Sequence, residues 1–172
     1  MARKTRTLAK RLERIGPDPK KHAEELFEMT GKVFSQANEY YGWIKMCRRT
    51  YFYRGHYDWK ASVIGLLDGR IVTHWGAWGY RMRIGRAVVR CAGIGDVATD
   101  GNFRCHGLMG ATGTAAMKAM RARGYDISIL FGRANFYDRF GYCRSWPGHD
   151  WSVGLADLPA DKPRGKVEKL TS

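Results

Sequence analysis

The chain has 172 residues, a formal net charge of +14 and a hydrophobic content of 44%. This length suits one domain with a sizeable core, and the hydrophobic content argues against an intrinsically disordered chain. No apolar run approaches the roughly 18–20 residues that a membrane-spanning helix needs, so we expect no membrane partner. The basic N-terminus lacks the apolar stretch of a secretory signal, and we therefore expect a cytoplasmic protein.

The cysteines and histidines show no spacing typical of a metal site. No two cysteines form a Cys-x-x-Cys pair, and no two histidines are separated by one or three residues. We therefore expect reduced thiols and no metal cofactor. The residues concerned are Cys47, Cys91, Cys105 and Cys143, with His22, His56, His74, His106 and His149.

Part of the positive charge lies in the first 21 residues, where Glu13 and Asp18 are the acidic residues. This balance has two interpretations: a polyanionic partner such as nucleic acid, an acidic membrane surface or an anionic cofactor, or simply a solvated basic arm. We expect residues 1–10 to form a basic arm, residues 11–157 a single domain and residues 158–172 a mobile tail. The basic residues of this segment are Arg3, Lys4, Arg6, Lys10, Arg11, Arg14, Lys20 and Lys21.

The first third of the chain predicts a short strand followed by two helices. Residues 11–15 can form the strand, and the turn that follows offers Asp18 as an N-cap with Pro19 at the first helical position. Residues 37–48 predict a second, shorter helix, with Tyr40, Trp43, Ile44 and Cys47 on its buried side. One face of the first helix carries Ala23, Leu26, Phe27, Thr30, Val33 and Phe34 at helical spacing.

The middle of the chain predicts an antiparallel meander of three strands. Asp68-Gly69 is a strong two-residue hairpin turn, and Gly85 lies at a second chain reversal. Gly93 and Gly95 interrupt the third strand, which indicates a bulge or a close backbone approach. The expected strands are Ala61–Leu67, Arg70–Arg83 and Ala87–Thr99.

The last third predicts a long helix and a parallel strand. Residues 106–123 fit a helix closed by Gly124, and residues 126–131 form an apolar strand; a crossover of this length places its two strands parallel. We expect the helix to bury Leu108, Ala111, Ala115, Ala119 and Ala122. A short helix at 135–140 and closing strands at 142–146 and 151–155 complete the expected elements.

The segment Val97–Gly110 is the most informative part of the sequence. It predicts a strand that ends in a turn, followed by a helix start that contains glycine. A helix start has backbone N–H groups without partners and a partial positive charge, so it binds phosphate or pyrophosphate well. Gly107 and Gly110 lack a Cβ, which lets a ligand lie against the backbone.

The sequence resembles the GNAT superfamily of N-acetyltransferases. The family signature is a V-x-V strand followed by [R/Q]-x-x-G-x-[G/A]; here Val97-Ala98-Thr99 fills the strand part, and Arg104, Gly107 and Met109 stand at the turn positions. Met109 departs from the final small residue, with Gly110 one place later. A second match, Phe136–Tyr142, has the form F-Y-x-R-x-G-[F/Y]. The resemblance implies an α/β (α+β) fold with a mixed, mostly antiparallel sheet, opened after residues 97–99, and helices on both faces.

Residues 123–132 ahead of the second match look most like the enhanced-intracellular-survival branch of this superfamily. Those proteins are longer, and we expect this chain to match their N-terminal catalytic part. The resemblance implies direct transfer of acetyl from acetyl-coenzyme A to a primary amine, without a metal. It implies that Tyr137 protonates the departing thiolate. The residues that it implies for cofactor binding are Val97, Ala98, Thr99, Arg104, Cys105, His106, Gly107, Leu108, Met109, Gly110, Gly132 and Arg133.

Several points stay open at this stage. The general base is not identified; Asp96, Glu39, His56, His74 and a water chain are all candidates. The branch suggests small amines such as aminoglycosides, or lysine side chains, as acceptors, with aromatic residues of the segment 37–60 along the acceptor pocket. Two alternatives use the same fold without catalysis: a basic nucleic-acid- or ribosome-binding module, and an acyl-coenzyme A sensor. The oligomeric state is also open, with a homodimer among the options.

Overall fold

The computed structural model describes residues 8–36, 38–53, 55–145 and 154. The chain divides into two compact units, residues 1–142 and 143–172. None of the helices within the described ranges is long and apolar enough to cross a membrane. The tail expected at 158–172 lies outside the described residues, as does the strand expected at 151–155 apart from Gly154.

The centre of the first unit is a five-stranded sheet in the order β1-β2-β3-β4-β5. Neighbouring strands from β1 to β4 are antiparallel, and β5 runs parallel to β4. The expected mixed, mostly antiparallel sheet is confirmed. The strands are β1 (Glu13–Ile15), β2 (Val63–Leu67), β3 (Arg70–Ile84), β4 (Ala87–Thr99) and β5 (Ile127–Leu130).

The turn between β2 and β3 shows why the meander forms. Asp68 and Gly69 have φ angles of 50° and 79°, and positive φ at both central residues is the conformation that matches the twist of a tight hairpin. Arg11 donates to both carboxylate oxygens of Asp68, at 2.7 and 2.8 Å. This contact ties the helical turn at residues 8–11 to the hairpin.

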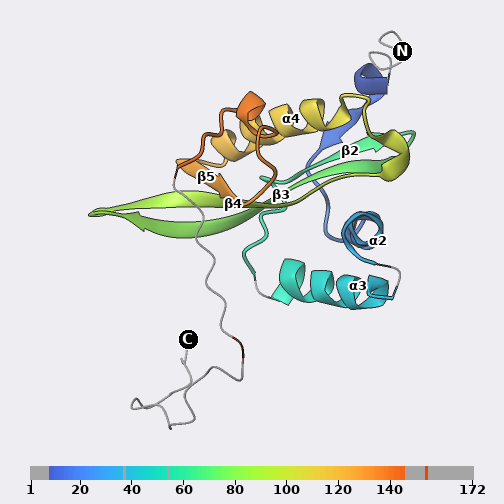
Figure 1. The fold of residues 1–172 in the computed structure, drawn as a ribbon, viewed down its shortest axis with the longest axis horizontal. Helices are drawn as coiled ribbons and strands as arrows, with labels where there is room; N and C mark the ends of the chain where they lie inside the picture. The colour runs from blue at the N-terminus through green and yellow to red at the C-terminus, as the bar shows by residue number, and fades with distance from the viewer. Residues whose placement is uncertain (1–7, 37, 54, 146–153, 155–172) are drawn as a thin grey trace. The chain divides into compact units, whose positions relative to one another are not determined.

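Helices cover both faces of the sheet, as expected (Figure 1). One face carries α2 (Ala23–Phe34) and α3 (Tyr40–Arg48), with a π-helical turn at Arg49–Tyr53, and the other carries α4 (Leu108–Ala122). The expectation that α2 starts at Pro19 is wrong, because the helix starts after His22. Asp18 instead accepts the N–H groups of Lys20 and Lys21, at 2.8 and 2.9 Å, in the turn before the helix.

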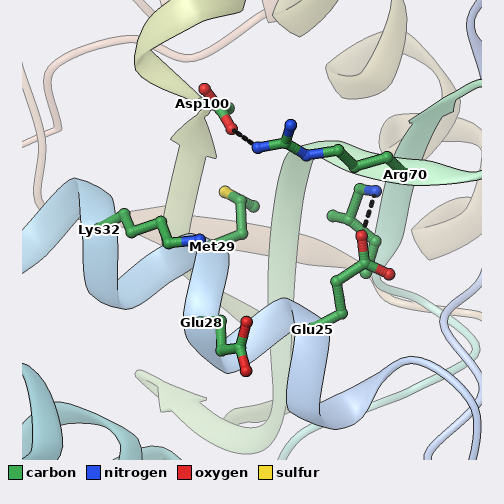
Figure 2. Close-up of a pocket in the computed structure, with 7 residues that line it drawn as sticks. Glu25, Glu28, Met29, Lys32, Arg70 and Asp100 are labelled. Carbon is green, nitrogen blue, oxygen red and sulfur yellow. Dashed lines mark hydrogen bonds and ion pairs between the residues drawn. The ribbon is translucent and has the colours of Figure 1, made fainter.

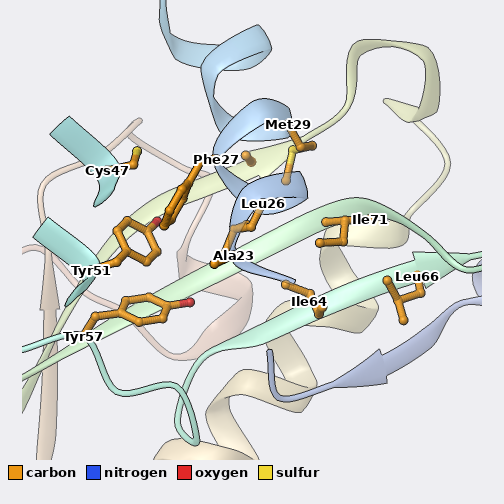
Figure 3. Packing of buried hydrophobic residues seen from close by; sticks show 11 residues of the cluster. Ala23, Leu26, Phe27, Met29, Cys47, Tyr51, Tyr57, Ile64, Leu66 and Ile71 are labelled. Atoms are coloured by element: carbon orange, nitrogen blue, oxygen red, sulfur yellow. The ribbon is translucent and has the colours of Figure 1, made fainter. Parts of the chain in front are cut away.

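The core on the α2 face combines aliphatic residues with buried tyrosines (Figure 3). Leu26 and Phe27 of α2 are fully buried against the sheet. The Phe27 ring meets Tyr51 edge-on, with ring centroids 5.0 Å apart, and Tyr57 lies beside Tyr51 at 4.2 Å. Two tyrosine hydroxyls are therefore buried in this core, and each needs a hydrogen-bonding partner.

On the opposite face, α4 is rotated by about one residue from the expected orientation. Leu108 is buried as predicted, but Ala122 is exposed and the other three predicted alanines are only partly buried. Thr112 bonds Thr73 of β3 at 2.7 Å, and a Cβ on Gly113 would lie 2.5 Å from the Phe140 ring. The hydroxyl pair and the space that Phe140 needs therefore set which side of α4 faces the sheet. The buried residues are Leu108, Thr112, Gly113, Ala116 and Met120.

The C-terminal part of the unit is less regular than the sequence indicates. The helix expected at 135–140 is a single 3-10 turn, Asp138–Phe140, because Asn135 has a φ of 60° that a right-handed helix does not accept. The strand expected at 142–146 is wrong for the described residues 142–145, which form no strand. Tyr142 accepts a hydrogen bond from Ser128 of β5 at 2.7 Å, and this side-chain contact holds the segment.

Candidate functional site

The site begins where β4 and β5 separate. Their parallel pairing runs from Cys91 with Ile127 to Ile94 with Leu130, and β5 ends there while β4 continues to Thr99. The opening therefore starts after Ile94, earlier than the expected position after residues 97–99. The last part of β4 has β3 along one edge and no strand along the other among the described residues. A ligand can pair with this open edge.

The backbone of residues 97–99 has groups directed at the open edge. Asp100 donates its N–H to the carbonyl of Val72 at 2.9 Å, and Ala98 stands opposite His74 in the same ladder. Since successive peptide groups of a strand alternate in direction, the carbonyl of Val97 and the N–H of Thr99 point away from β3. The side chain of Ala98 is buried in the α2 face. This stretch therefore offers the Val97 carbonyl as an acceptor and the Thr99 N–H as a donor to an extended ligand, while the Thr99 carbonyl on the same side accepts from Arg104.

The second part of the site is the start of α4. Gly107 is the N-cap with a φ of 72°, and Cys105 also has a positive φ, 62°. Ala111 donates to the Gly107 carbonyl at 3.3 Å, and no described side chain caps the helix. The N–H groups of Leu108, Met109 and Gly110 precede that bond, so the helix leaves them without intrahelical partners. These amides and the helix dipole form a cradle for an anion.

The space around this cradle is open. A Cβ on Gly107 or on Gly110 would have no heavy atom of the described chain within 4 Å. Leu108 is buried, so it can offer only its backbone to a ligand, and Met109 is half-buried in the core. The glycines keep the approach to these amides free of side chains.

Hydrogen bonds and an ion pair of Asp100 hold the first residues of the loop that precedes α4. Asp100 accepts from Arg70 at 2.9 Å and from the N–H of Asn102 at 3.0 Å, which caps the 3-10 turn Gly101–Phe103. The Arg70–Asp100 pair forms part of a pocket of about 370 Å³ beside α2 (Figure 2). There the carboxylate of Glu25 accepts the N–H of Ile71 at 2.8 Å. These contacts hold the end of β4 and with it the start of the loop.

Of the other residues that we expected at the cofactor site, Arg104, Cys105 and His106 lie in this loop, and Arg133 lies after the end of β5. Arg104 is exposed and its Nε donates to the Thr99 carbonyl at 3.4 Å. Cys105 and Arg133 are exposed. His106 has a buried Nδ1 with no partner in the described part of the chain. The loop thus brings a cationic side chain to the end of β4.

Tyr137 lies on the α4 side of the opening. Its ring stands 5.8 Å from that of Trp75 and 6.0 Å from that of Tyr142, between centroids. A Cβ on Gly132 would be 2.6 Å from the Tyr137 ring, so glycine at this position leaves room for the tyrosine. Partial burial raises the pKa of Tyr137, which keeps its phenol protonated at neutral pH.

A buried polar network lies on the other side of β4. The register of β3 and β4 shifts between His74 and Gly76, and Asp96 at this bulge has a φ of 47°. Its carboxylate accepts a hydrogen bond from the Tyr51 hydroxyl at 2.6 Å. Burial raises the pKa of Asp96, and the Tyr51 bond works in the opposite direction. Asp96 is thus the one carboxylate among our candidate bases that stands on the strand at the opening.

His74 lies next to Asp96, and both nitrogens of its imidazole form hydrogen bonds. Its Nδ1 bonds the carbonyl of Asp96 at 2.7 Å, so Nδ1 carries the proton and Nε2 accepts from the Tyr57 hydroxyl at 2.8 Å. Complete burial lowers the pKa of His74 to about 4. His74 is therefore neutral and its lone pair is occupied. The other two candidates are exposed: Glu39 at the start of α3, and His56 against the Tyr80 ring at 5.3 Å.

The aromatic residues of this side form one cluster. Tyr57 packs edge-on against Trp59 at 4.8 Å and Trp78 at 5.0 Å, and Trp78 is half-buried with no described partner for its Nε1. By contrast Tyr41 and Tyr53 are 83% and 85% exposed, so they take no part in it. The sequence pattern placed Tyr51 only among the aromatic residues of the segment 37–60 and did not single out Tyr57. Their hydrogen-bonding partners, Asp96 and His74, lie on β4 and β3, far away in the sequence, so no local pattern reveals them.

The family can now be assigned. A model of the family described as "Acetyltransferase (GNAT) domain" matches residues 17–144. This match covers most of the chain. The protein belongs to the GNAT acetyltransferase family. No curated protein matches the chain.

Solved structures of GNAT proteins share the fold at low sequence identity. Glucosamine-6-phosphate N-acetyltransferase from Arabidopsis thaliana is 14% identical with a TM-score of 0.61, over 82% of this chain and 97% of that one. An aminoglycoside acetyltransferase from an uncultured soil metagenomic sample is 18% identical with a TM-score of 0.59, over 83% and 99%. Eis1 from Mycobacterium abscessus is 14% identical with a TM-score of 0.59, over 76% of this chain and 30% of Eis1. These likenesses establish the GNAT fold.

Proposed function

We propose that the protein transfers an acetyl group from acetyl-coenzyme A to a primary amine. The observation that carries the proposal is the adjacency of two features: the open edge of β4 and the uncapped start of α4. They are consecutive elements of the chain, joined by the loop at 100–107. An extended ligand with an amide-containing arm and a diphosphate would satisfy both.

In this proposal the pantetheine arm pairs with β4. The Val97 carbonyl accepts and the Thr99 N–H donates, as a neighbouring strand would do. The diphosphate lies on the amides from Cys105 to Gly110, with Arg104 and Arg133 as charge partners. The glycines at 107 and 110 fit this ligand, because a side chain there would occupy the space in front of the amides.

The chemistry is a direct displacement. The nitrogen of the neutral amine attacks the thioester carbonyl, the C–N bond forms, and the C–S bond breaks with its electron pair on sulfur. Tyr137 gives its phenolic proton to the sulfur, and the amine loses one proton. The raised pKa of Tyr137 suits a general acid at neutral pH. Positioning of the two reactants supplies much of the rate enhancement.

The amine approaches from the α2 side, where Asp96 stands. Asp96 is bonded to Tyr51 of that face, whereas Tyr137 packs with Trp75 under α4, so acid and carboxylate flank the opening from opposite faces of the sheet. Asp96 receives the proton of the attacking amine, directly or through a water. The aromatic cluster beside it provides ring faces that suit an ammonium group.

The experiment measures thiol release from acetyl-coenzyme A with a panel of aminoglycosides, polyamines and lysine peptides. We expect turnover with at least one amine. In Tyr137→Phe, turnover falls on the order of a hundredfold while the Kd for acetyl-coenzyme A is unchanged. Tyr41→Phe, an exposed tyrosine, is the matched control and keeps wild-type turnover. Unchanged turnover in Tyr137→Phe would remove the residue from this role; cofactor binding without turnover on any amine would favour a sensor.

A further inference from the structure

The hairpin of β3 and β4 continues well beyond the sheet (Figure 1). Strand β2 pairs with β3 only between Arg70 and Trp75, and β5 pairs with β4 only from Cys91 onward. We call residues 80–90 the ribbon. Both of its edges lack a neighbouring strand in the described structure. The ribbon therefore contributes little to the core and is free to contact another molecule.

Four arginines and no acidic residue lie in the ribbon. Arg81 stands directly opposite Arg90, and Arg83 opposite Val88, so three of the arginines share one face. Arg86 is at the tip, after Gly85, whose φ of 59° closes the turn. All four side chains are exposed, and none forms an ion pair within residues 8–36, 38–53 and 55–145.

This arrangement does not serve the stability of the hairpin. Like charges directly opposite each other on two strands destabilise the pairing, and here Arg81 and Arg90 face each other. Asp126, the carboxylate at the base of the ribbon, accepts the backbone N–H of Arg90 at 2.8 Å. The Arg90 guanidinium instead lies 5.2 Å from the centre of the Tyr125 ring. Among the described residues, the positive face thus has no compensating carboxylate.

The other face of the ribbon is apolar. It carries Tyr80, Met82 and Ile84, of which Tyr80 is 45% and Ile84 53% exposed. If these residues entered a lipid surface, the arginine face would turn away from the headgroups. A membrane therefore fits the ribbon poorly, whereas a narrow two-stranded ribbon fits a nucleic-acid groove, and the major groove of B-DNA admits one.

We propose that the ribbon binds duplex nucleic acid through its phosphate backbone. In this proposal Arg81, Arg83 and Arg90 contact phosphates along one strand of the duplex. Arg86, at the tip of the ribbon, enters the groove. Guanidinium groups bind phosphate through two parallel hydrogen bonds, which a lysine does not offer. The net charge of +14 adds long-range attraction to a polyanion. This binding is independent of the acetyl-transfer proposal, since none of the four arginines lies at the β4–β5 opening.

The test is the affinity of the full chain for a fluorescent 20-base-pair DNA duplex between 50 and 300 mM salt. The variant is Arg81→Thr/Arg83→Thr/Arg86→Thr, and the control is Arg14→Thr/Lys20→Thr/Arg121→Thr, which removes the same charge at exposed sites elsewhere. Each lost phosphate contact lowers the slope of log K against log salt by about 0.9, and the affinity in 0.1 M salt by about eightfold. We therefore expect a slope smaller by about 2.7 in the ribbon variant and a much smaller change in the control.

Folding is checked by the melting temperature, which we expect the ribbon variant to retain because it relieves a like-charge pair. Two outcomes would overturn the proposal. The first is no duplex binding by the wild type; binding to vesicles with 30% anionic phospholipid, or arginine-dependent self-association in sedimentation, would then show what the ribbon contacts instead. The second is an equal loss of affinity in variant and control, which would mean that the net charge alone, and not the ribbon, attracts the duplex.

Discussion

The buried imidazole of His74 predicts a specific loss of stability in acid. An unfolded histidine titrates at a pKa of about 6.5, whereas burial lowers the pKa of His74 to about 4. Below pH 6.5 the unfolded chain gains a proton that the folded protein does not accept. The contribution of His74 is therefore fully present above pH 6.5 and is lost as the pH falls toward 4.

The size of this loss follows from the shift. One pKa unit corresponds to about 1.4 kcal/mol, so His74 accounts for about 3 kcal/mol between pH 6.5 and pH 4. For a chain of this length that amounts to a decrease in melting temperature of roughly 6–12 °C. The assay is calorimetry of the wild type and of His74→Gln across this pH range.

His74→Gln is expected to melt lower than the wild type at pH 7, since it loses packing, but its melting temperature then falls less in acid. His56→Gln, at an exposed histidine, tests whether the loss of any histidine has this effect. Parallel curves for the wild type and His74→Gln would refute the assignment of a neutral, bonded imidazole in the core.

Four further predictions concern single residues. Gly113→Ala places a methyl group against Phe140 and should cost about 1–3 kcal/mol of unfolding free energy, measured by urea denaturation. Gly110→Ala, in open space on the same helix, should leave stability equal or up to about 1 kcal/mol higher yet weaken acetyl-coenzyme A binding in calorimetry. Tyr51→Phe removes a bond that lowers the pKa of Asp96, so the acidic limb of the rate profile should move to higher pH. Asp96→Asn should reduce turnover by about a hundredfold or more at pH 7; full activity would assign the base to another group.

The sequence was most informative where local chemistry decides the structure. The Asp68-Gly69 turn, the strands on either side of it and the glycine N-cap of α4 are set by residues that are neighbours in the chain. The segment from Val97 to Gly110 likewise predicts a strand, a turn and a helix start that follow one another along the chain. The structure has all three.

Contacts between distant residues could not be predicted in this way. The rotation of α4 depends on Thr73 and Phe140, which are far from the helix in sequence. The Tyr51–Asp96 bond joins residues 45 positions apart, and the bulge that presents Asp96 arises from the register with β3. The sequence alone therefore could not distinguish Tyr51 from the other aromatic residues; only the folded sheet shows that it bonds Asp96 of β4.

The positive charge of the chain likewise could be predicted from the sequence, but the arrangement of the charged side chains could not. Composition predicts a polyanionic partner or a solvated surface and cannot choose between them. The ribbon became a candidate only through the register, which sets Arg81 against Arg90. Which residues share a face depends on pairing, and pairing is a property of the folded chain.

A titration of the ¹⁵N-labelled protein with acetyl-coenzyme A, followed by amide chemical shifts and amide exchange rates, tests whether the cofactor binds along the end of β4 and the start of α4. The amides of Thr99, Leu108, Met109 and Gly110 should show the largest shifts and become protected from exchange. Saturable binding that leaves these four amides unchanged would contradict the account, as would the absence of binding.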